Sequence, residues 1–402
     1  MRRQYLAIKK QFPETILFFR LGDFYETFDD DARIVSEVCD VVLTSRPVGA
    51  DERVPLAGVP YHSVDPHIAR LVAAGYKVAI AEQIGSEPPP GEKLVERTVR
   101  RVITAGTIVE PAMLEEGRNN YLAAIAFSTQ RADRYGQSAA GPEHSTLSIG
   151  LAYADITTGE FAATELAGPE ALRLLQEELA RLQPAEVLVA EWQVQGRKLQ
   201  VARSPEAKRT GGGRWHEVPQ RSVVDVAGGE AGDRHEIDDW MDGAERLFTG
   251  IAVSRIPAWR FEEETARQAL LEQFEVETLA AFGCDHLPQA VRAAGALVQY
   301  LRETQRATLP QLVSLRVYST DEFMTLDQAT RRNLELTQTI RGANKKGSLL
   351  GVLDATRTPM GSRLLRRWLH QPLLDMDKLT KRLMLSSTGT TTYRPAPSCA
   401  PF

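Results

Sequence analysis

The pattern of hydrophobic and polar positions in residues 1–105 predicts a mixed α/β unit. The apolar residues of Arg2–Gln11 fall on one side of a short basic helix that ends before Pro13. Thr15–Leu21 is rich in β-branched and aromatic residues, which indicates a strand. The other predicted elements are a helix over Pro66–Ala74, a strand over Tyr76–Glu82, a proline-rich loop over Ser86–Gly91 and a strand over Val95–Thr104.

A second α/β unit is predicted after a linker at Gly106–Asn120. Three strand candidates come first, and Gly159 makes a turn between the second and third, which is typical of an antiparallel meander. Leucines at helical spacing predict a helix over Glu170–Leu182, and Ala185–Ala190 predicts a buried strand, so the pattern is that of an α/β layer architecture. The three candidates are Tyr121–Phe127, Thr146–Asp155 and Gly159–Leu166, and residues 203–245 predict a long surface loop.

From about Phe261 the apolar residues repeat at helical spacing, which predicts an all-α third part. Thr358 and Pro359 suit the N-cap and first position of a helix that runs through His370. The tail from Ser386 is rich in Ser, Thr, Gly and Pro, so we expect no helix to continue into it. The predicted organisation is multidomain: an α/β domain at 1–105, a linker at 106–120, an α/β domain at 121–255, the start of a helical domain at 256–385 and a separate tail at 386–402.

Composition narrows the function classes. The 402 residues are 43% hydrophobic and 25% charged, which is ordinary globular composition. The apolar runs fall far short of the roughly 20 residues of a membrane helix, and three widely spaced cysteines support no disulfide framework, so we expect a cytoplasmic protein without a membrane partner. The net charge of −5 argues against nucleic-acid binding through bulk positive charge, although residues 331–382 carry 12 basic and 4 acidic side chains, a net charge of +8.

The common signals of enzymes are absent. Gly342–Ser348 comes nearest to a phosphate loop, but its lysines precede the second glycine, so we expect no catalytic residue and no nucleotide cofactor in this chain. The seven histidines show no ligand spacing, and no metal site is expected. Asp155 and Glu160 leave one alternative open, a metal-dependent nuclease, which requires three or more carboxylates meeting at Asp155.

The sharpest local feature is Gly22–Phe28, Gly-Asp-Phe-Tyr-Glu-Thr-Phe. In one interpretation Asp23 and Glu26 form a capping box at the start of a helix and the aromatic residues are core. In the other, a strand-to-helix turn exposes an aromatic ring that wedges or stacks on a base, and the carboxylate faces the edge of that base.

The segment Phe18–Glu26 resembles the mismatch-reading segment of the MutS family of DNA mismatch-repair proteins. The resemblance covers roughly residues 3–385 in family order and departs from the family in the tail, for which we expect a frameshift, a premature stop or a gene-fragment boundary. Its further segments are Pro55–His62, Val78–Gln83, Arg101–Thr107, Asp155–Glu160, Pro184–Leu188, Leu326–Leu336, Gly347–Thr356 and Thr358–Trp368.

The resemblance implies a mismatch-recognition domain, an RNase H-like connector and an incomplete helical core. It implies that Phe24 stacks on the mispaired base from the minor groove and that Glu26 hydrogen-bonds to that base. Arg97, Arg100 and Arg101 are candidates for contact with the DNA backbone. The implied partners are double-stranded DNA with mismatches or small loops, a MutL-type repair protein and, for the intact family, a second copy.

The resemblance implies that the intact family is an ATPase that uses ATP and Mg²⁺, and we expect this chain to lack the lever arms, clamp and phosphate-loop ATPase of that family. The implied location is the cytoplasm, in association with the nucleoid. An alternative is a non-catalytic interaction module that binds a repair partner through the connector.

Overall fold

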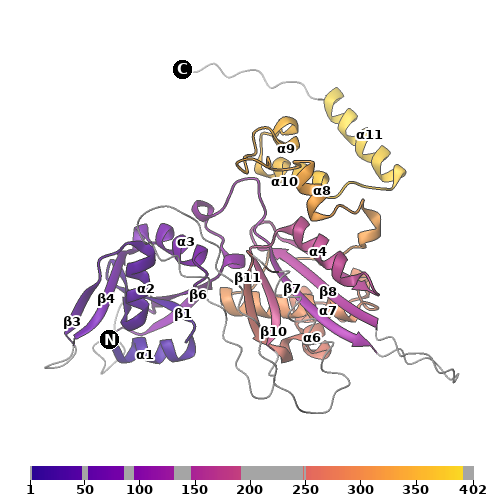
Figure 1. Ribbon diagram of the computed structural model, residues 1–402. Helices are drawn as coiled ribbons and strands as arrows, with labels where there is room; N and C mark the ends of the chain where they lie inside the picture. The colour runs from indigo at the N-terminus through magenta and orange to yellow at the C-terminus, as the bar shows by residue number, and fades with distance from the viewer. Residues whose placement is uncertain are drawn as a thin grey trace, which may run out of the picture. The chain divides into compact units, whose positions relative to one another are not determined.

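The computed structural model describes residues 2–47, 53–85, 95–130, 146–191, 248 and 250–392, and two six-stranded sheets organise them (Figure 1). The predicted loops at Ser86–Gly91 and 203–245 lie outside the described residues. The first sheet has the order β3-β4-β2-β1-β5-β6, and β1 pairs with β5 in parallel. Its elements are α1 (Arg2–Gln11), β1 (Thr15–Leu21), β2 (Phe24–Phe28), α2 (Asp29–Cys39), β3 (Thr44–Pro47), β4 (Arg53–Pro60), α3 (Asp65–Ala73), β5 (Lys77–Gln83) and β6 (Arg97–Ile103).

Helices cover both faces of this sheet, so alternate residues of each strand enter different cores. Leu17 and Phe19 of β1 pack with Tyr5 of α1 on one face. Ile16 and Phe18 pack on the other face, in the core that includes buried residues of α2 and α3. The strand reads as a continuous apolar run because neither face meets water.

The turn after β1 leads into a strand, whereas the sequence predicted the start of a helix there. Gly22 and Asp23 form a two-residue β-hairpin turn, and β1 and β2 are antiparallel with Leu21 opposite Phe24. Gly22 has a φ of 57°, which a glycine adopts without strain at the first position of such a turn. Asp23 therefore caps no helix, and the capping-box interpretation is wrong. The next helix, α2, begins at Asp29.

The second sheet has the order β11-β10-β7-β8-β9-β12. The predicted meander is confirmed, since β8 is antiparallel to both β7 and β9, and β10 is parallel to β7. Its elements are β7 (Leu122–Gln130), β8 (Thr146–Asp155), β9 (Glu160–Ala167), α4 (Ala171–Leu182), β10 (Glu186–Glu191), β11 (Ala252–Pro257), α6 (Glu263–Phe274), α7 (Pro288–Gln305) and β12 (Arg316–Val317).

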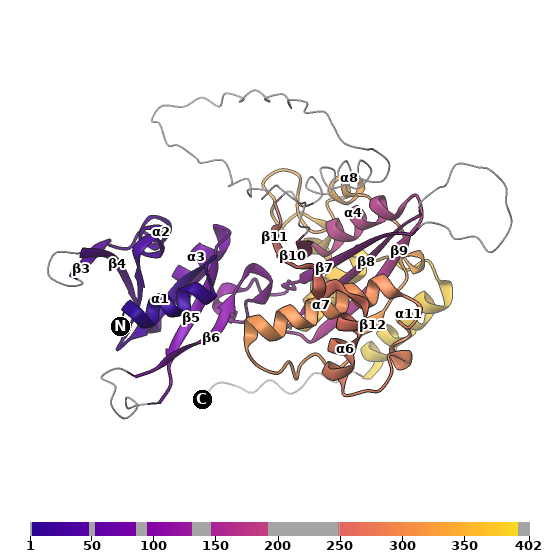
Figure 2. The same cartoon turned by 90° about the horizontal axis from the view of Figure 1, so that it is seen from below.

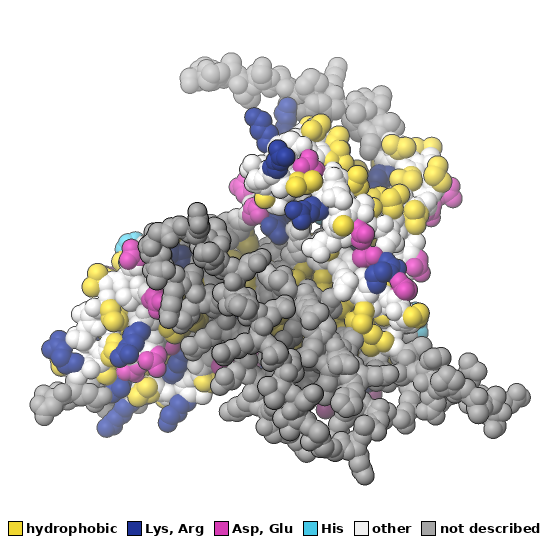
Figure 3. Space-filling model, in the orientation of Figure 1, with side chains coloured by type: hydrophobic (Ala, Val, Ile, Leu, Met, Phe, Trp, Pro, Cys, Tyr) yellow, Lys and Arg dark blue, Asp and Glu magenta, His cyan; other side chains and the backbone are white. Residues whose placement is uncertain are grey.

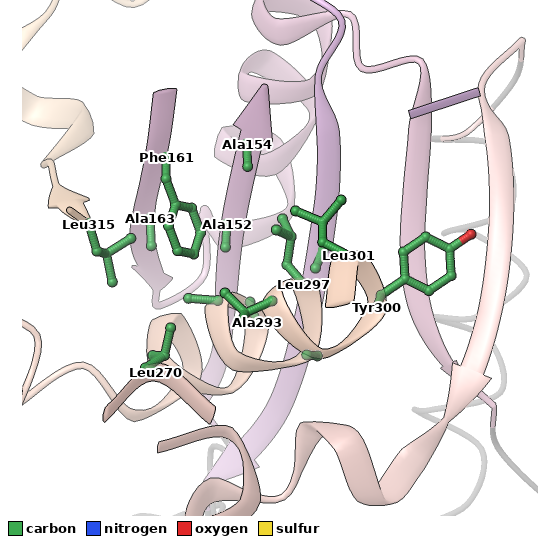
Figure 4. Packing of buried hydrophobic residues seen from close by; sticks show 14 of the residues in the cluster. Ala152, Ala154, Phe161, Ala163, Leu270, Ala293, Leu297, Tyr300, Leu301 and Leu315 are labelled. Carbon is green, nitrogen blue, oxygen red and sulfur yellow. The ribbon is translucent and has the colours of Figure 1, made fainter. Parts of the chain in front are cut away.

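The long helix α7 lies across this sheet (Figure 2). Ala293, Leu297 and Leu301 point toward the alanines of β8, which are small enough to let the helix approach (Figure 4). A Cβ atom on Gly150 of β8 would lie 1.9 Å from the Gln289 carbonyl oxygen, so the N-terminal turn of α7 requires glycine there.

The predicted boundary between residues 255 and 256 is therefore wrong. Helices α6 and α7 share one hydrophobic core with β7, β8 and β9, and β12 extends the same sheet. The helical period of this segment correctly predicts helices, but a period alone does not show against which element the apolar face of a helix packs.

Helices continue after the second sheet, and Thr358 caps α10 as predicted, with its hydroxyl accepting from the Gly361 N–H at 3.1 Å. The expectation for the tail is wrong, because α11 runs to Thr392. Serine and threonine cost a helix only about half a kcal/mol each, so a helix already formed can extend through them. The helices are α8 (Gln328–Asn333), α9 (Leu349–Leu353), α10 (Pro359–His370) and α11 (Met376–Thr392); 3₁₀ turns lie at Tyr61–Ser63, Ala105–Thr107, Pro111–Met113, Ala258–Phe261, Ala280–Phe282 and Thr320–Glu322.

Among the described helices, none has the length and apolar character that crossing a membrane requires.

One buried carboxylate connects the exit from the first sheet with the second. Glu186, 1% exposed, accepts hydrogen bonds from the Thr104 hydroxyl and, at 2.9 Å, from the Gly106 N–H. Its other oxygen accepts from the hydroxyls of Ser254 at 2.5 Å and Tyr300 at 2.7 Å. Four donors replace the water that the carboxylate loses on burial.

We expect Glu186→Ala to lower the free energy of unfolding by about 2–4 kcal/mol, because the substitution leaves several buried donors without an acceptor. Chemical denaturation measures this difference. Glu191→Ala, at the exposed end of the same strand, is the control and should change stability by less than about 0.5 kcal/mol. Equal effects of the two substitutions would contradict the role of the network.

We also expect the backbone amides of α9 to α11 to exchange with solvent faster than those of α7. The C-terminal helices leave large apolar side chains exposed, and yellow side chains lie on the surface of this part of the chain in Figure 3. Most of α7, in contrast, is buried. Hydrogen exchange followed by mass spectrometry makes the comparison. Protection of residues 358–383 as strong as that of α7 would contradict it. The exposed side chains include Val352, Met360, Leu364, Leu383, Met384 and Leu385.

Candidate nucleic-acid interface

Phe24 and Glu26 lie side by side on one face of β2. They are two residues apart in a strand, so their side chains point the same way, while Tyr25 points into the core. The Phe24 ring is 47% exposed. Gly58 of β4 is opposite Glu26, and a Cβ atom there would lie 3.7 Å from Glu26 Cγ and 3.8 Å from Phe24 Cδ1. Because Gly58 has no side chain, the backbone of β4 is left uncovered beside the ring and the carboxylate.

The hairpin turn that presents Phe24 is braced from both sides. Arg20 Nε donates to the Gly22 carbonyl at 2.5 Å, and the Tyr61 N–H donates to the Asp23 carbonyl at 3.0 Å. The Arg20 guanidinium lies 3.7 Å from the centre of the Tyr61 ring, within the range of a cation–π interaction. These contacts hold the end of β2, and hence the Phe24 backbone, in a fixed position.

Among the described residues, Arg46 of β3 forms an ion pair with Glu26. Arg46 Nη1 lies 3.3 Å from Glu26 Oε2, and the Glu26 side chain is 19% exposed. Burial raises the pKa of Glu26, and the charge and hydrogen bond of Arg46 oppose that shift. The carboxyl group therefore takes up a proton more readily than an exposed glutamate, and a protonated carboxyl can donate as well as accept a hydrogen bond.

The three arginines predicted to contact the DNA backbone have different environments. Arg97 is buried, donates from Nε to the Arg20 carbonyl at 2.7 Å and lies over the Phe19 ring, so its assignment as a backbone contact is wrong. Arg101 is half-buried and paired with Glu110. Arg100 alone of the three is exposed. The pleat of β6 separates neighbours that the sequence grouped together.

Arg46 is a residue of this site that no pattern in the sequence predicts. It lies 20 residues after Glu26, and the two meet because β4 holds β3 and β2 in one sheet. No spacing in the sequence indicates this pairing, although a basic residue in a short polar strand is a weak signal of an exposed edge.

Asp155 and Glu160 do not form the arrangement that a nuclease requires. Asp155 is fully buried and accepts from the Asn119 amide at 2.9 Å and the Thr157 N–H at 2.9 Å, which is turn chemistry. Glu160 pairs with Arg367 at 2.7 Å. In the described part of the chain, no three side chains of His, Cys, Asp or Glu come together as a metal site.

The loop Gly342–Ser348 uses its polar groups internally. Lys345 Nζ pairs with Asp354 at 2.6 Å, and the Ser348 hydroxyl accepts from the Gly351 N–H at 3.1 Å at the start of α9. The loop leads into a helix of five residues, and Lys345, one of its two lysines, is already paired. These residues do not fit the triphosphate of ATP or its Mg²⁺ ion.

Comparison with known families gives three matches in order along the chain. The model described as MutS domain I matches residues 1–112, MutS domain II matches residues 120–212 and 243–313, and MutS domain III matches residues 329–390. The second match includes α6 and α7, in agreement with their shared core. The third extends beyond residue 385, where the sequence analysis placed the end of the resemblance.

Curated relatives carry the name DNA mismatch repair protein MutS. The protein of Roseiflexus castenholzii is 42% identical over 94% of this chain and 35% of its own length. The proteins of Dehalococcoides mccartyi and Symbiobacterium thermophilum are 39% and 41% identical, over 95% and 98% of this chain and 36% and 38% of their own lengths. The chain thus spans little more than a third of these relatives. Three consecutive domain matches and identities near 40% show that the chain belongs to the MutS family.

Proposed function

We propose that this chain recognises mispaired and looped-out bases in double-stranded DNA, as part of DNA mismatch repair. One observation carries the proposal: next to a hairpin turn that is held by hydrogen bonds, β2 presents an exposed phenyl ring, Phe24, beside a half-buried carboxyl group, Glu26. The printed name of the relatives supports the process in which the site acts.

A phenyl ring suits this task because mismatches have no common sequence. Direct readout in the major groove distinguishes base pairs by their edges, so it cannot define a mismatch as a class. What mismatches share is poor stacking and easy deformation. Insertion of Phe24 costs a few kcal/mol of unstacking at a paired step and less at a mismatch, while stacking on the ring returns about 1–3 kcal/mol with any base.

Glu26 adds discrimination against paired DNA. An ionised carboxylate is repelled by phosphates unless it finds a base donor or takes up a proton, and paired DNA seldom offers that donor in the required place. The partial burial that raises the pKa of Glu26 makes protonation easier. Arg46 donates to Glu26 Oε2, so a base donor would bind the other oxygen or replace this ion pair.

The other parts of the chain extend the proposal. We assign Arg100 a contact with the DNA backbone, because it is exposed on the strand that carries the other two candidates. We assign the second sheet an RNase H-like fold, supported by its three-stranded meander and by β10, parallel to the first strand of the meander. For the whole protein we propose homodimerisation, a MutL-type partner, ATP and Mg²⁺ bound outside the described residues, and action in the cytoplasm at the nucleoid.

We expect Phe24→Ala to weaken binding to a single-mismatch duplex by about 5–150-fold, the equivalent of a stacking contribution of about 1–3 kcal/mol. Binding to matched duplex should change little, because paired steps resist insertion. Fluorescence anisotropy at fixed salt measures both affinities. Val42→Ala removes part of another exposed apolar side chain of the same unit and should change neither. Equal losses on both duplexes in Phe24→Ala would refute the assignment.

We expect Glu26→Ala to hold or raise affinity for matched duplex and to reduce discrimination, because it removes both the repulsion from phosphates and the bond to the base.

In the unsubstituted chain, affinity for mismatched duplex should rise by up to about tenfold from about pH 8 to about pH 5, since protonation of Glu26 begins at higher pH when its pKa is raised.

The pH dependence should disappear in Glu26→Gln, whereas Glu37→Gln, at an exposed position of α2, should keep it. The same pH profile in Glu26→Gln as in the unsubstituted chain would exclude Glu26 as the titrating group.

A further inference from the structure

A second site is independent of the mismatch-recognition proposal. A hollow of about 40 Å³ lies between the segment before β7, the C-terminal end of α4 and one face of α10. A water molecule needs about 10–15 Å³ in such a measure, so the hollow holds about three waters, comparable to a small tetrahedral anion. Five arginines line it: Arg118, Arg181, Arg363, Arg366 and Arg367.

Helical spacing brings most of these charges together. Arg363, Arg366 and Arg367 are separated by three and four residues in α10, so they lie on one face of the helix, and His370 continues that face. Dark-blue Lys and Arg side chains are visible over this part of the molecule (Figure 3). The three arginines of α10 belong to the segment 331–382, whose net charge is +8.

Three of the five arginines have carboxylate partners. Arg181 donates to both oxygens of Glu178, at 2.9 and 2.6 Å. Arg367 pairs with Glu160 at 2.7 Å, and Arg118 lies 3.4 Å from Glu115. These three positive charges are compensated within the structure.

Arg363 and Arg366 are different. Neither forms an ion pair or hydrogen bond with the residues that the structure describes, and the Nε atom of each is buried without an acceptor. A buried charged donor without an acceptor costs free energy that a ligand can recover. Two of the arginines that line the hollow therefore have no ion-pair partner, although the charges of Glu115 and Asp354 act on Arg366 at longer range.

The protonation state of His370 also reflects the positive charge of the arginines around it. Arg331 Nη1 lies 3.1 Å from His370 Nδ1, and because arginine only donates, this ring nitrogen must be the acceptor of a neutral imidazole. Burial, followed by the charges of Arg331, Arg366, Arg181 and Arg118, lowers the pKa of His370 to about 3. The neutral histidine adds no charge to the hollow, and the arginine charges that disfavour its protonation favour an anion.

We propose that the hollow binds a phosphate group, held by Arg363 and Arg366. Planar guanidinium groups donate in a fork that matches phosphate oxygens, and no lysine lines the hollow. The same chemistry fits a free phosphate ion or a phosphate of the DNA backbone. A bound anion would supply the ion-pair partner that Arg363 and Arg366 lack in the described part of the chain.

The test uses the 402-residue chain with inorganic phosphate and, in a second arm, a short matched duplex. Isothermal titration at constant ionic strength, with sodium chloride as the reference salt, should show saturable phosphate binding. Arg363→Gln and Arg366→Gln should each weaken it about 10–100-fold, the effect of one charge-assisted hydrogen bond. Arg357→Gln, an exposed arginine just before α10 and outside the hollow, is the matched control and should leave it unchanged.

The two arms distinguish the source of the phosphate. Saturable binding of inorganic phosphate that depends on both arginines supports a site for the free ion. Loss of duplex affinity in Arg363→Gln and Arg366→Gln, without binding of inorganic phosphate, supports a backbone contact. Binding of neither probe, equal effects of sodium chloride, or affinities unchanged in both variants would overturn the proposal.

A second measurement covers variants that fold poorly. The imidazole resonances of His370, assigned with His370→Gln, should shift on addition of phosphate to the unsubstituted chain, because the anion changes the potential at the ring. Shifts confined to other histidines would place the ion elsewhere and overturn the proposal.

Discussion

The alternation of side chains across β2 is the constraint on which the candidate site depends. Both faces of the first sheet are covered by helices, so Tyr25 and Phe28 are buried in opposite cores. Phe24 lies at the hairpin end of the strand and remains about half exposed. Burial of an aromatic side chain stabilises a protein by about 1.5–3 kcal/mol, so the fold forgoes part of that stabilisation at Phe24. A register shift of one residue would bury the ring and expose the core of the hairpin.

The Glu186 network has a comparable role where the chain leaves the first sheet. The 3₁₀ turn at Ala105–Thr107 has no hydrophobic core of its own, and its hydrogen bonds to Glu186 tie it to the second sheet. Tyr300 of α7 donates to the same carboxylate. Burial of Tyr300 raises the pKa of its hydroxyl, and the charge of Glu186 raises it further. A single acceptor thus fixes a turn, a strand and a helix that lie far apart in the sequence.

The sequence predicted most elements because periodicity and turn residues act locally. Predictions from the sequence were wrong where pairing between distant strands determines the type of element or the environment of a side chain. Phe24–Phe28 is rich in β-favouring residues, but the aspartate before it suggested a helix cap, and only pairing with β1 and β4 makes the segment a strand. Arg97 is buried and Arg46 reaches Glu26 for the same reason. The helical period of α7 likewise gave no indication that its partner is the sheet of the preceding domain.

The distribution of charge explains why discrimination is assigned to an uncharged ring and a titratable carboxyl. Residues 1–107 carry 14 basic and 15 acidic side chains, so the recognition unit has no excess positive charge to attract DNA irrespective of its pairing. Affinity must then come from local contacts, and stacking on Phe24 is favourable only where the duplex opens easily. On the proposed function, the ionised form of Glu26 would weaken binding to every duplex that does not compensate it. Weak general attraction and a strong local condition would then make binding depend on the state of one base pair.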